Sequence, residues 1–214
     1  MEKLVMVLAS RNAHKIKELR MMLSERLKID FELKSLDDIG FTEDIEENGN
    51  SFKENALIKA NAVARAGYIG LADDSGLVVP ALGGAPGIYS ARYAGEHGND
   101  AANNQKLMDE MKGIADRSAY YVCAMAMAFP DGKAPLIAEG TLEGELLFSP
   151  RGEGGFGYDP LFWIDELGKT LAEIPTEEKN LFSHRSRALD KLCEQLAMRL
   201  GLYSRHVPPS DGEM

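Results

Sequence analysis

Two aspartates stand side by side in the stretch LADDSG, residues 71–76, directly after an apolar run. In a strand, neighbouring side chains point to opposite faces. If both faces of the sheet are covered, at least one of Asp73 and Asp74 must therefore face a group that attracts negative charge. Such a carboxylate could bind a cation or accept a proton. The alternative is that the pair merely ends the strand, because Asp and Ser-Gly are common in turns.

The segment ASRNAHK, residues 9–15, has the residue types of a phosphate site between an apolar run and a helical pattern. Free N–H groups at the start of a helix, together with the charge of Lys15, attract anions. The segment is not a Walker motif, and Ser10 or Asn12 could simply cap the helix while Lys15 is solvated.

Lys59 is a second candidate cation. It falls on the helical stripe of Phe52, Ala56, Ala60 and Val63, which should face the core. An ammonium on that stripe must either reach water along its own stem or meet an anion.

The acidic segment EDIEENGN, residues 43–50, supplies Glu46 and Glu47. Magnesium prefers a few carboxylates together with phosphates and water, so one of these glutamates and one aspartate of DDSG would make a credible metal site. The alternative is that the acidic run is only solvated surface.

Two further segments could bind a nucleobase. In GGFGYDP, residues 154–160, glycines flank Phe156 and would let a flat ligand stack on the ring. Lys179, His184 and Arg185 precede or open the last helical pattern and offer donors to phosphate or carbonyl oxygens. Each segment, taken alone, could equally be surface.

Composition limits the partners of this 214-residue chain. A formal charge of −10 argues against binding to nucleic acid or to anionic membranes, so a phosphate ligand would need a local basic cluster. No apolar run approaches the roughly 20 residues that span a bilayer, and the N-terminus does not have the pattern of a secretory signal. A cytoplasmic protein is expected, with Cys123 and Cys193 as core thiols.

The periodicity of the sequence predicts the elements that position these residues. Strands are expected at residues 3–9, 31–39, 69–79, 119–129 and 136–148, the third interrupted at DDSG and the last two joined as an antiparallel hairpin by PDGK. Helices are expected at residues 13–27, 51–67 and 100–112, with a final helix that carries Leu189, Leu192, Leu196 and Leu200 on one stripe. The fold class is therefore α/β, with a mixed twisted sheet flanked by helices in one domain of two lobes.

The ordered set of motifs is more specific than any one of them. S-x-N-x-x-K at 10–15, E-E-N-G at 46–49, SFKENALIKA at 51–60, LADDSGL at 71–77, PGIYSARYAG at 86–95, GGFGYDP at 154–160 and SHR at 183–185 stand in this order. Together they resemble the inosine/xanthosine triphosphate pyrophosphatases, the Ham1-like family. The resemblance covers about residues 4–200. One domain is expected over residues 1–203, and the polar tail, residues 204–214, is expected to be disordered.

The resemblance implies hydrolysis of non-standard purine nucleoside triphosphates (ITP, dITP and XTP) to the monophosphate and pyrophosphate, which keeps these nucleotides out of DNA and RNA. It also implies one or more Mg²⁺ ions per subunit, and a homodimer in which each active site lies in a cleft between two lobes.

The resemblance further implies a role for each site residue. The phosphates would be held by Ser10, Arg11, Asn12, Ala13, His14 and Lys15, with help from Lys59. The metal would be bound by Glu46 and Asp74, and Asp74 would also accept the proton of the attacking water, with Ser75 touching the substrate. The base and sugar would be embraced by Phe156, Gly157, Tyr158 and Asp159. Lys179 would approach the base or the phosphates, and the 6-oxo group would be read by His184 and Arg185.

Two alternatives remain open at this stage. One is a different hydrolase, either a Maf-like nucleotidase that acts on modified pyrimidine triphosphates or a phosphatase that releases orthophosphate. The other is a nucleotide sensor without catalysis, against which the presence of both Glu46 and Asp74 speaks, since a pure anion pocket has no use for carboxylates.

Overall fold

A single seven-stranded sheet organises the computed structural model, which describes residues 3–11 and 13–202. The strand order is β2-β1-β3-β4-β5-β6-β7. The strands are β1 (Leu4–Leu8), β2 (Phe31–Lys34), β3 (Ile69–Val78), β4 (Ser118–Ala128), β5 (Leu136–Leu146), β6 (Phe162–Ile164) and β7 (Lys169–Thr170). β1 pairs in parallel with β2 and β3, and every later pairing is antiparallel. The expected mixed sheet and its long β4–β5 hairpin are confirmed.

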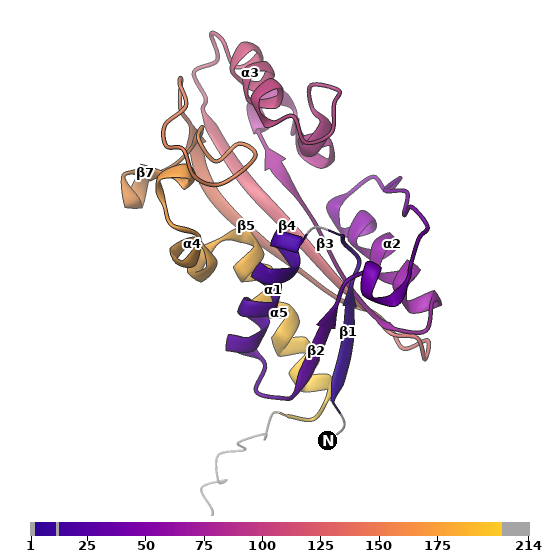
Figure 1. Cartoon of the computed structure of the whole chain (residues 1–214). Helices are drawn as coiled ribbons and strands as arrows, with labels where there is room; N and C mark the ends of the chain where they lie inside the picture. Colours follow the sequence, from indigo (N-terminus) through magenta and orange to yellow (C-terminus); the bar gives the residue numbers. More distant parts are fainter. Residues whose placement is uncertain (1–2, 12, 203–214) are drawn as a thin grey trace, which may run out of the picture.

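Helices cover both faces of this sheet (Figure 1). They are α1 (Ala13–Arg26), α2 (Phe52–Arg65), α3 (Asp100–Glu110), α4 (Thr176–Phe182) and α5 (His184–Arg199). α1 and α5 lie side by side and pack with β1 and β4 in one apolar core. Ala56 and Ala60 of α2 pack against alanines of β3 and β4 in a second core.

β3 runs between these two cores and contributes alternate residues to each. Leu71 belongs to the core beneath α1 and α5, whereas Ala72 belongs to the core beneath α2. The same alternation continues along the strand, so Asp73 faces the side of α1 and α5 and Asp74 faces the side of α2. The two carboxylates therefore serve opposite faces of one strand.

The expectation that β3 is interrupted at DDSG was wrong. Asp73 lies opposite Met125 of β4 and Asp74 lies opposite Ala124, within a ladder that is unbroken from Gly70 to Val78. The turn tendency of Asp-Ser-Gly is overridden because β4 pairs with this whole stretch. The alternative that the aspartates end the strand is excluded for the same reason.

Local side-chain bonds explain where two other elements begin and end. Ser51 caps α2 by accepting a hydrogen bond from the N–H of Glu54 at 3.2 Å, as its spacing predicted. β2 is shorter than the expected strand over residues 31–39. Ser35 and Asp38 exchange hydrogen bonds of 2.7 and 3.1 Å, which start a 3₁₀ turn at Asp37–Ile39 and end the extended backbone.

Gly140 of β5 sets how closely the start of α5 approaches the sheet. A Cβ atom at this position would overlap the carbonyl oxygen of His184 and the backbone nitrogen of Ala188. Only glycine leaves room for the first turn of α5 to lie directly on the strand. This turn carries His184 and Arg185, so the glycine positions two of the expected base-reading residues.

Gly140→Ala should therefore lower the free energy of unfolding by about 1–3 kcal/mol, because the helix must shift to relieve the overlap. The hydrolysis that the family resemblance implies should slow as well, since His184 and Arg185 move with α5. Urea unfolding and steady-state kinetics would measure both effects. Thr141→Ala, at the exposed neighbouring position, should change stability by no more than about 0.5 kcal/mol. Unchanged stability in Gly140→Ala would show that the first turn of α5 does not pack closely against Gly140.

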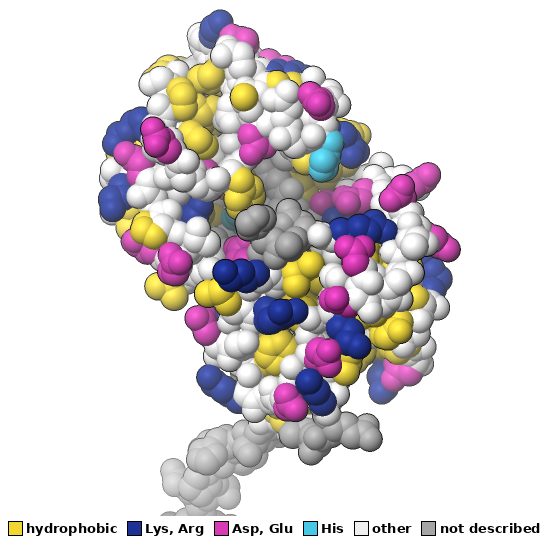
Figure 2. Space-filling view, viewed as in Figure 1, with side chains coloured by type: hydrophobic (Ala, Val, Ile, Leu, Met, Phe, Trp, Pro, Cys, Tyr) yellow, Lys and Arg dark blue, Asp and Glu magenta, His cyan; other side chains and the backbone are white. Residues whose placement is uncertain are grey.

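The expectations about the cysteines, membrane spans, surface charge and the polar tail can be compared with the structure where it describes the residues. Cys123 and Cys193 are buried and unbonded to each other, as expected of core thiols. Within residues 3–11 and 13–202, no helix is long and apolar enough to cross a membrane. Acidic and basic side chains are interspersed on the face drawn in Figure 2, which has no continuous basic surface. The polar tail, residues 204–214, lies outside the described residues.

Candidate active site

Asp73 is the most deeply buried carboxylate of the site, with 3% of its surface exposed. Its Oδ1 lies 2.6 Å from Nζ of Lys15, and its Oδ2 lies 3.5 Å from Nε of Arg185. Burial alone would raise the pKa of Asp73, but the charges of Lys15, Arg185 and Lys59 outweigh it and hold the pKa well below its usual range. Asp73 therefore stays ionised and joins α1 to α5 beneath the sheet.

Asp74 has a different environment on the opposite face. Its Oδ1 lies 3.3 Å from Nζ of Lys59, and its Oδ2 accepts a hydrogen bond of 3.1 Å from Nδ2 of Asn55. Burial raises the pKa of Asp74, the charge of Lys59 opposes that rise, and the charge of Glu47 adds to it. A half-buried carboxylate with a raised pKa is well suited to accept a proton from water.

Glu47 reaches this group from the acidic segment. Its Oε2 lies 3.1 Å from Nζ of Lys59, so Lys59 contacts carboxylates from two segments of the chain. Glu46, the glutamate expected to bind metal, is exposed, and no contact places it beside Asp74 in the described part of the chain. The segment is held against α2 because Asn55 Oδ1 accepts a hydrogen bond of 2.9 Å from the N–H of Gly49. Its geometry favours Glu47 over Glu46.

The pair formed by Glu47 and Asp74 fits a magnesium ion in its chemistry. Both carboxylates lie against the same ammonium, so both point to one region of space. In the described ranges, 3–11 and 13–202, no group of three or more His, Cys, Asp or Glu side chains could hold a metal ion. Two protein carboxylates suit Mg²⁺ only if phosphate oxygens and water complete its shell.

The expected phosphate segment is only partly described. Lys15 lies in the first turn of α1, where it pairs with Asp73, and Ser10 follows β1. Arg11 turns to the loop over residues 37–44, where its guanidinium donates to the carbonyl oxygens of Phe41 and Glu43. Ala13 and His14 begin α1, but their side chains, like all of Asn12, lie outside what the structure describes. Of this segment, the structure brings Lys15 into the site.

The GGFGYDP segment forms a loop around Asp159. The Oδ2 atom of Asp159 accepts hydrogen bonds from Nζ of Lys179 at 3.0 Å and from the N–H of Phe156 at 3.2 Å. Phe156 is 61% exposed, and Nζ of Lys179 and Cζ of Arg185 lie 6.0 and 5.9 Å from the centre of its ring. An exposed ring beside two buried cations is a stacking platform for a base that accepts hydrogen bonds at its edge.

Gly157 and Tyr158 have structural contacts. Asp100 accepts a hydrogen bond of 2.7 Å from the N–H of Gly157, and Asn104 donates one of 2.7 Å to its carbonyl oxygen. The hydroxyl of Tyr158 donates to the carbonyl oxygen of Ser90 at 2.8 Å, and the ring is buried. The start of α3 thus fixes the loop behind Phe156, and the side chain of Tyr158 points into the core.

His184 and Arg185 open α5 and are both buried. The His184 imidazole stacks on Tyr121 with ring centres 4.8 Å apart and planes at 10°. Burial, with the charge of Arg185, lowers the pKa of His184 to about 3, so the ring is neutral at physiological pH. Its Nδ1 atom is buried without a hydrogen-bond partner among the described residues, so a ligand would reach it only if the surrounding side chains shift.

The neutral His184 should make stability depend on pH. Below pH 6.5 the unfolded chain binds a proton at this group, whereas the folded protein does so only near pH 3, so folding weakens as pH falls through that window. At pH 5 the loss should reach about 2 kcal/mol relative to pH 7. Urea unfolding of the wild type and His184→Gln at both pH values would measure it. His184→Gln should not show this loss of stability at pH 5, whereas His97→Gln, at an exposed position, should show it in full. An equal dependence of stability on pH in all three proteins would contradict the assignment of this loss to His184.

Several contacts of the site were missed by the sequence reasoning. Asn55 lies one helical turn before Lys59 in SFKENALIKA, so helical spacing could have placed both on one face. Tyr121 and Asn104 gave no local signal, because their partners are 38 and 53 residues away along the chain. Ser75 was expected to touch the substrate; it follows Asp74 in β3 and lies opposite Cys123.

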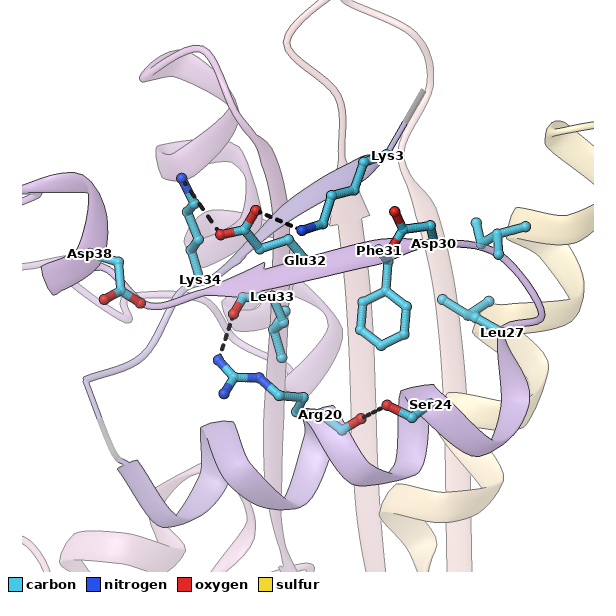
Figure 3. Close-up of a pocket in the computed structure, with 11 residues that line it drawn as sticks. Lys3, Arg20, Ser24, Leu27, Asp30, Phe31, Glu32, Leu33, Lys34 and Asp38 are labelled. Carbon is cyan, nitrogen blue, oxygen red and sulfur yellow. Dashed lines mark hydrogen bonds and ion pairs between the residues drawn. The ribbon is translucent and has the colours of Figure 1, made fainter. Parts of the chain in front are cut away.

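A cavity of about 850 Å³ lies away from this site along the edge strand β2 (Figure 3). Two of the lysines that line it, Lys3 and Lys34, form ion pairs with Glu32. Arg20 donates to the carbonyl oxygen of Leu33 at 2.8 Å and so covers an edge of the sheet. Its cations are exposed or half-buried, whereas Lys59 and Arg185 are buried, so this cavity is a poorer anion site than the group around Asp73 and Asp74.

The fold and this set of residues define a nucleotide-handling α/β protein, and comparison with known proteins gives its family. The Ham1 family model matches residues 6–195, and the chain belongs to that family.

Three similar proteins illustrate the likeness. A dITP/XTP pyrophosphatase from Bacillus subtilis is 48% identical over 193 residues, which cover 89% of this chain and 96% of the relative. One from Bacillus anthracis is 47% identical over 194 residues, covering 89% and 95%. The solved structure of the Staphylococcus aureus Ham1 protein has a TM-score of 0.83 at 39% identity and covers 91% of this chain and 99% of its own.

Proposed function

We propose that this protein hydrolyses non-standard purine nucleoside triphosphates (dITP, ITP and XTP) to the monophosphate and pyrophosphate, and so keeps them out of DNA and RNA. The observation that carries the proposal is the pair of neighbouring aspartates in β3. Asp73 contacts a phosphate-side cation, Lys15, and a base-side cation, Arg185. Asp74, on the other face, lies beside Lys59 with a raised pKa. The similarity to curated dITP/XTP pyrophosphatases supports the same activity.

The phosphates bind to a local basic cluster within an otherwise acidic protein. Lys15 stands in the first turn of α1, where the helix dipole adds to its charge, and Lys59 approaches from α2. Both ammonium groups are held by carboxylates in the free protein, which fixes their positions before substrate arrives. Charge stabilisation of this kind is the main requirement of phosphoryl chemistry.

Asp74 accepts the proton of the attacking water. Asn55 and Lys59 each hold one of its oxygens, so the carboxylate has a fixed direction. Asp74 lies on the face where Glu47 and Lys59 gather, while Asp73, held ionised by Lys15 and Arg185 on the other face, is a poor proton acceptor.

We propose Mg²⁺ as the cofactor, held by Asp74 and by a glutamate of the acidic segment. Glu46 was the expected ligand; the contact between Glu47 and Lys59 makes Glu47 the stronger candidate. When bound there, Mg²⁺ would neutralise phosphate charge and polarise the phosphoryl oxygen under attack.

The base lies on Phe156 and is read at its edge by the buried donors around it. Arg185 can only donate hydrogen bonds, so it matches the O6 acceptor of hypoxanthine or xanthine. Adenine carries an amino group at this position, which is a hydrogen-bond donor. It would face the Arg185 guanidinium, also a donor, and both groups would remain unpaired. A polar mismatch of this kind can discriminate strongly between substrates.

The active protein is proposed to be a cytoplasmic homodimer, with the site in a cleft between two lobes of each subunit. The dimer and the cleft follow from the family resemblance, and the location follows from the sequence pattern of the N-terminus. Light scattering of the purified protein would report the oligomeric state, and a monomer at micromolar concentration would contradict the proposed dimer.

A side-by-side assay with dITP, XTP, GTP, ATP and a modified pyrimidine triphosphate, with Mg²⁺ and with a chelator, tests this function. The proposal predicts turnover of dITP and XTP above the other three, and only with Mg²⁺. A pyrimidine preference would favour the Maf-like alternative. Binding of dITP without turnover would favour a sensor.

A further inference from the structure

We propose that Tyr121 positions the base-binding side chains of this site and thereby sets part of its preference for 6-oxo purines; this proposal rests on the proposed function. Tyr121 lies on β4, opposite Leu77 of β3 and Leu142 of β5. Its ring is buried, and it contacts residues from both segments that would bind the base. No local sequence pattern marks it, since its contacts cross from the sheet to the loop over residues 154–160 and to the start of α5.

The first contact is with the His184 imidazole. The two rings lie nearly parallel, at 10°, with their centres 4.8 Å apart. Rotation of an imidazole about its last side-chain torsion is otherwise only weakly restricted. The stack fixes the plane in which the His184 ring and its unpartnered Nδ1 atom lie. The Tyr121 ring also contacts the ring of Phe162. The two ring centres lie 4.8 Å apart, and the ring planes are tilted by 50°.

The second contact is with Asp159. The hydroxyl of Tyr121 donates a hydrogen bond of 3.3 Å to Oδ1 of Asp159, while Oδ2 of the same carboxylate holds Lys179 and the N–H of Phe156. Rotation of the carboxylate would displace both of those partners. Tyr121 thus restrains Lys179 and the stacking ring of Phe156 through one shared carboxylate.

Tyr121 acts through these neighbours and does not touch the substrate, because its ring is buried beneath His184 and Asp159. Burial, strengthened by the nearby charge of Asp159, raises the pKa of Tyr121 well above its usual value. The phenol therefore remains a hydrogen-bond donor over the whole working pH range. Its effect should fall on recognition of the base, with little effect on the phosphates.

Tyr121→Phe tests this assignment because it keeps the stacking ring and removes only the donor. KM for dITP should rise about 3- to 10-fold, the size of one ordinary hydrogen bond, because this bond of 3.3 Å acts on the substrate only through Asp159, while kcat changes less than about 2-fold. The inhibition constant of inorganic tripolyphosphate, which has no base, should stay the same. The ratio of kcat/KM for dITP to that for dATP should fall.

Tyr120→Phe is the matched control, since Tyr120 is the preceding residue of β4 and points to the opposite face. It should alter none of these quantities. KM and the inhibition constant do not depend on the fraction of active protein, so the comparison survives some loss of stability in Tyr121→Phe.

The outcomes separate the two proposals. An unchanged KM for dITP in Tyr121→Phe would overturn the role of Tyr121. A rise in KM matched by an equal rise in the tripolyphosphate inhibition constant would also overturn it, because the effect would then not concern the base. Failure of the wild type to hydrolyse dITP would instead overturn the proposed function, and this inference with it.

Discussion

Asp74→Asn will lower kcat for dITP by about 10² to 10⁴ while leaving the protein folded. Asparagine has nearly the same shape, and its one amide oxygen can accept from either Asn55 or Lys59, but the amide cannot accept a proton from water. The measurement is kcat at saturating dITP and Mg²⁺. Asp44→Asn, in the exposed part of the acidic segment, is the control and should keep wild-type turnover. Near-normal turnover in Asp74→Asn would remove this carboxylate from the mechanism.

The same variant should not lose stability. A carboxyl group whose pKa is higher in the folded protein than in the unfolded chain weakens folding at pH values above its unfolded pKa, because its charge is then less favourable in the folded state. Removing the charge of Asp74 at pH 7 should therefore leave the free energy of unfolding within about 1 kcal/mol of wild type, or raise it.

Asp73→Asn will have the opposite outcome and lower the free energy of unfolding by about 3–5 kcal/mol at pH 7. The substitution leaves Arg185 and Lys15 without their shared buried counter-charge, and Arg185 is almost fully enclosed. Glu18, 3.4 Å from Nη1 of Arg185, can offset only part of the loss. Urea unfolding would measure the free energy of unfolding of Asp73→Asn and Asp74→Asn. The two variants make the same chemical change at neighbouring residues, so their difference reports the surroundings of each carboxylate.

The pH dependence of this difference provides an internal check. The pKa of Asp73 is lower in the folded protein than its ordinary value of 3.8, so its stabilisation is fully present above that value and is lost as pH falls below it. The gap in stability between wild type and Asp73→Asn should therefore be constant from pH 7 to about pH 5 and narrow below about pH 4. Equal stability of the two proteins at pH 7 would contradict a structural role for Asp73.

The parts of the fold that follow from local patterns were predictable from the sequence. Ser51 caps α2 as its spacing with Glu54 indicated, and the apolar runs on either side of PDGK pair as an antiparallel hairpin. The core position of Lys59 followed from helical periodicity, which left open whether its ammonium reaches water or meets an anion. It meets two anions, Asp74 and Glu47.

The different roles of Asp73 and Asp74 were only partly predictable from the sequence. Strand alternation places them on opposite faces, but which face carries which partners depends on where α1, α2 and α5 pack. Turn propensity also misled the prediction for DDSG, because pairing with β4 outweighs it. The choice between Glu46 and Glu47 depends on the hydrogen bond from Gly49 to Asn55, which periodicity does not reveal.

Tyr121 lay beyond the reach of sequence patterns for a related reason. Its alternating position in a long strand predicts only that the ring is buried. That the ring meets His184 and Asp159 follows from the order of the strands and from the close approach of α5 over Gly140. Contacts that join three distant segments depend on the whole topology.

The identity of the products from dITP tests the central claim most directly. The purified protein should be incubated with dITP and Mg²⁺, and its products separated and quantified, with Asp74→Asn in parallel. The account predicts dIMP and pyrophosphate in equal amounts from the wild type, and a rate lower by about 10² or more from the variant. Release of dIDP and orthophosphate, or equal rates from the two proteins, would contradict it.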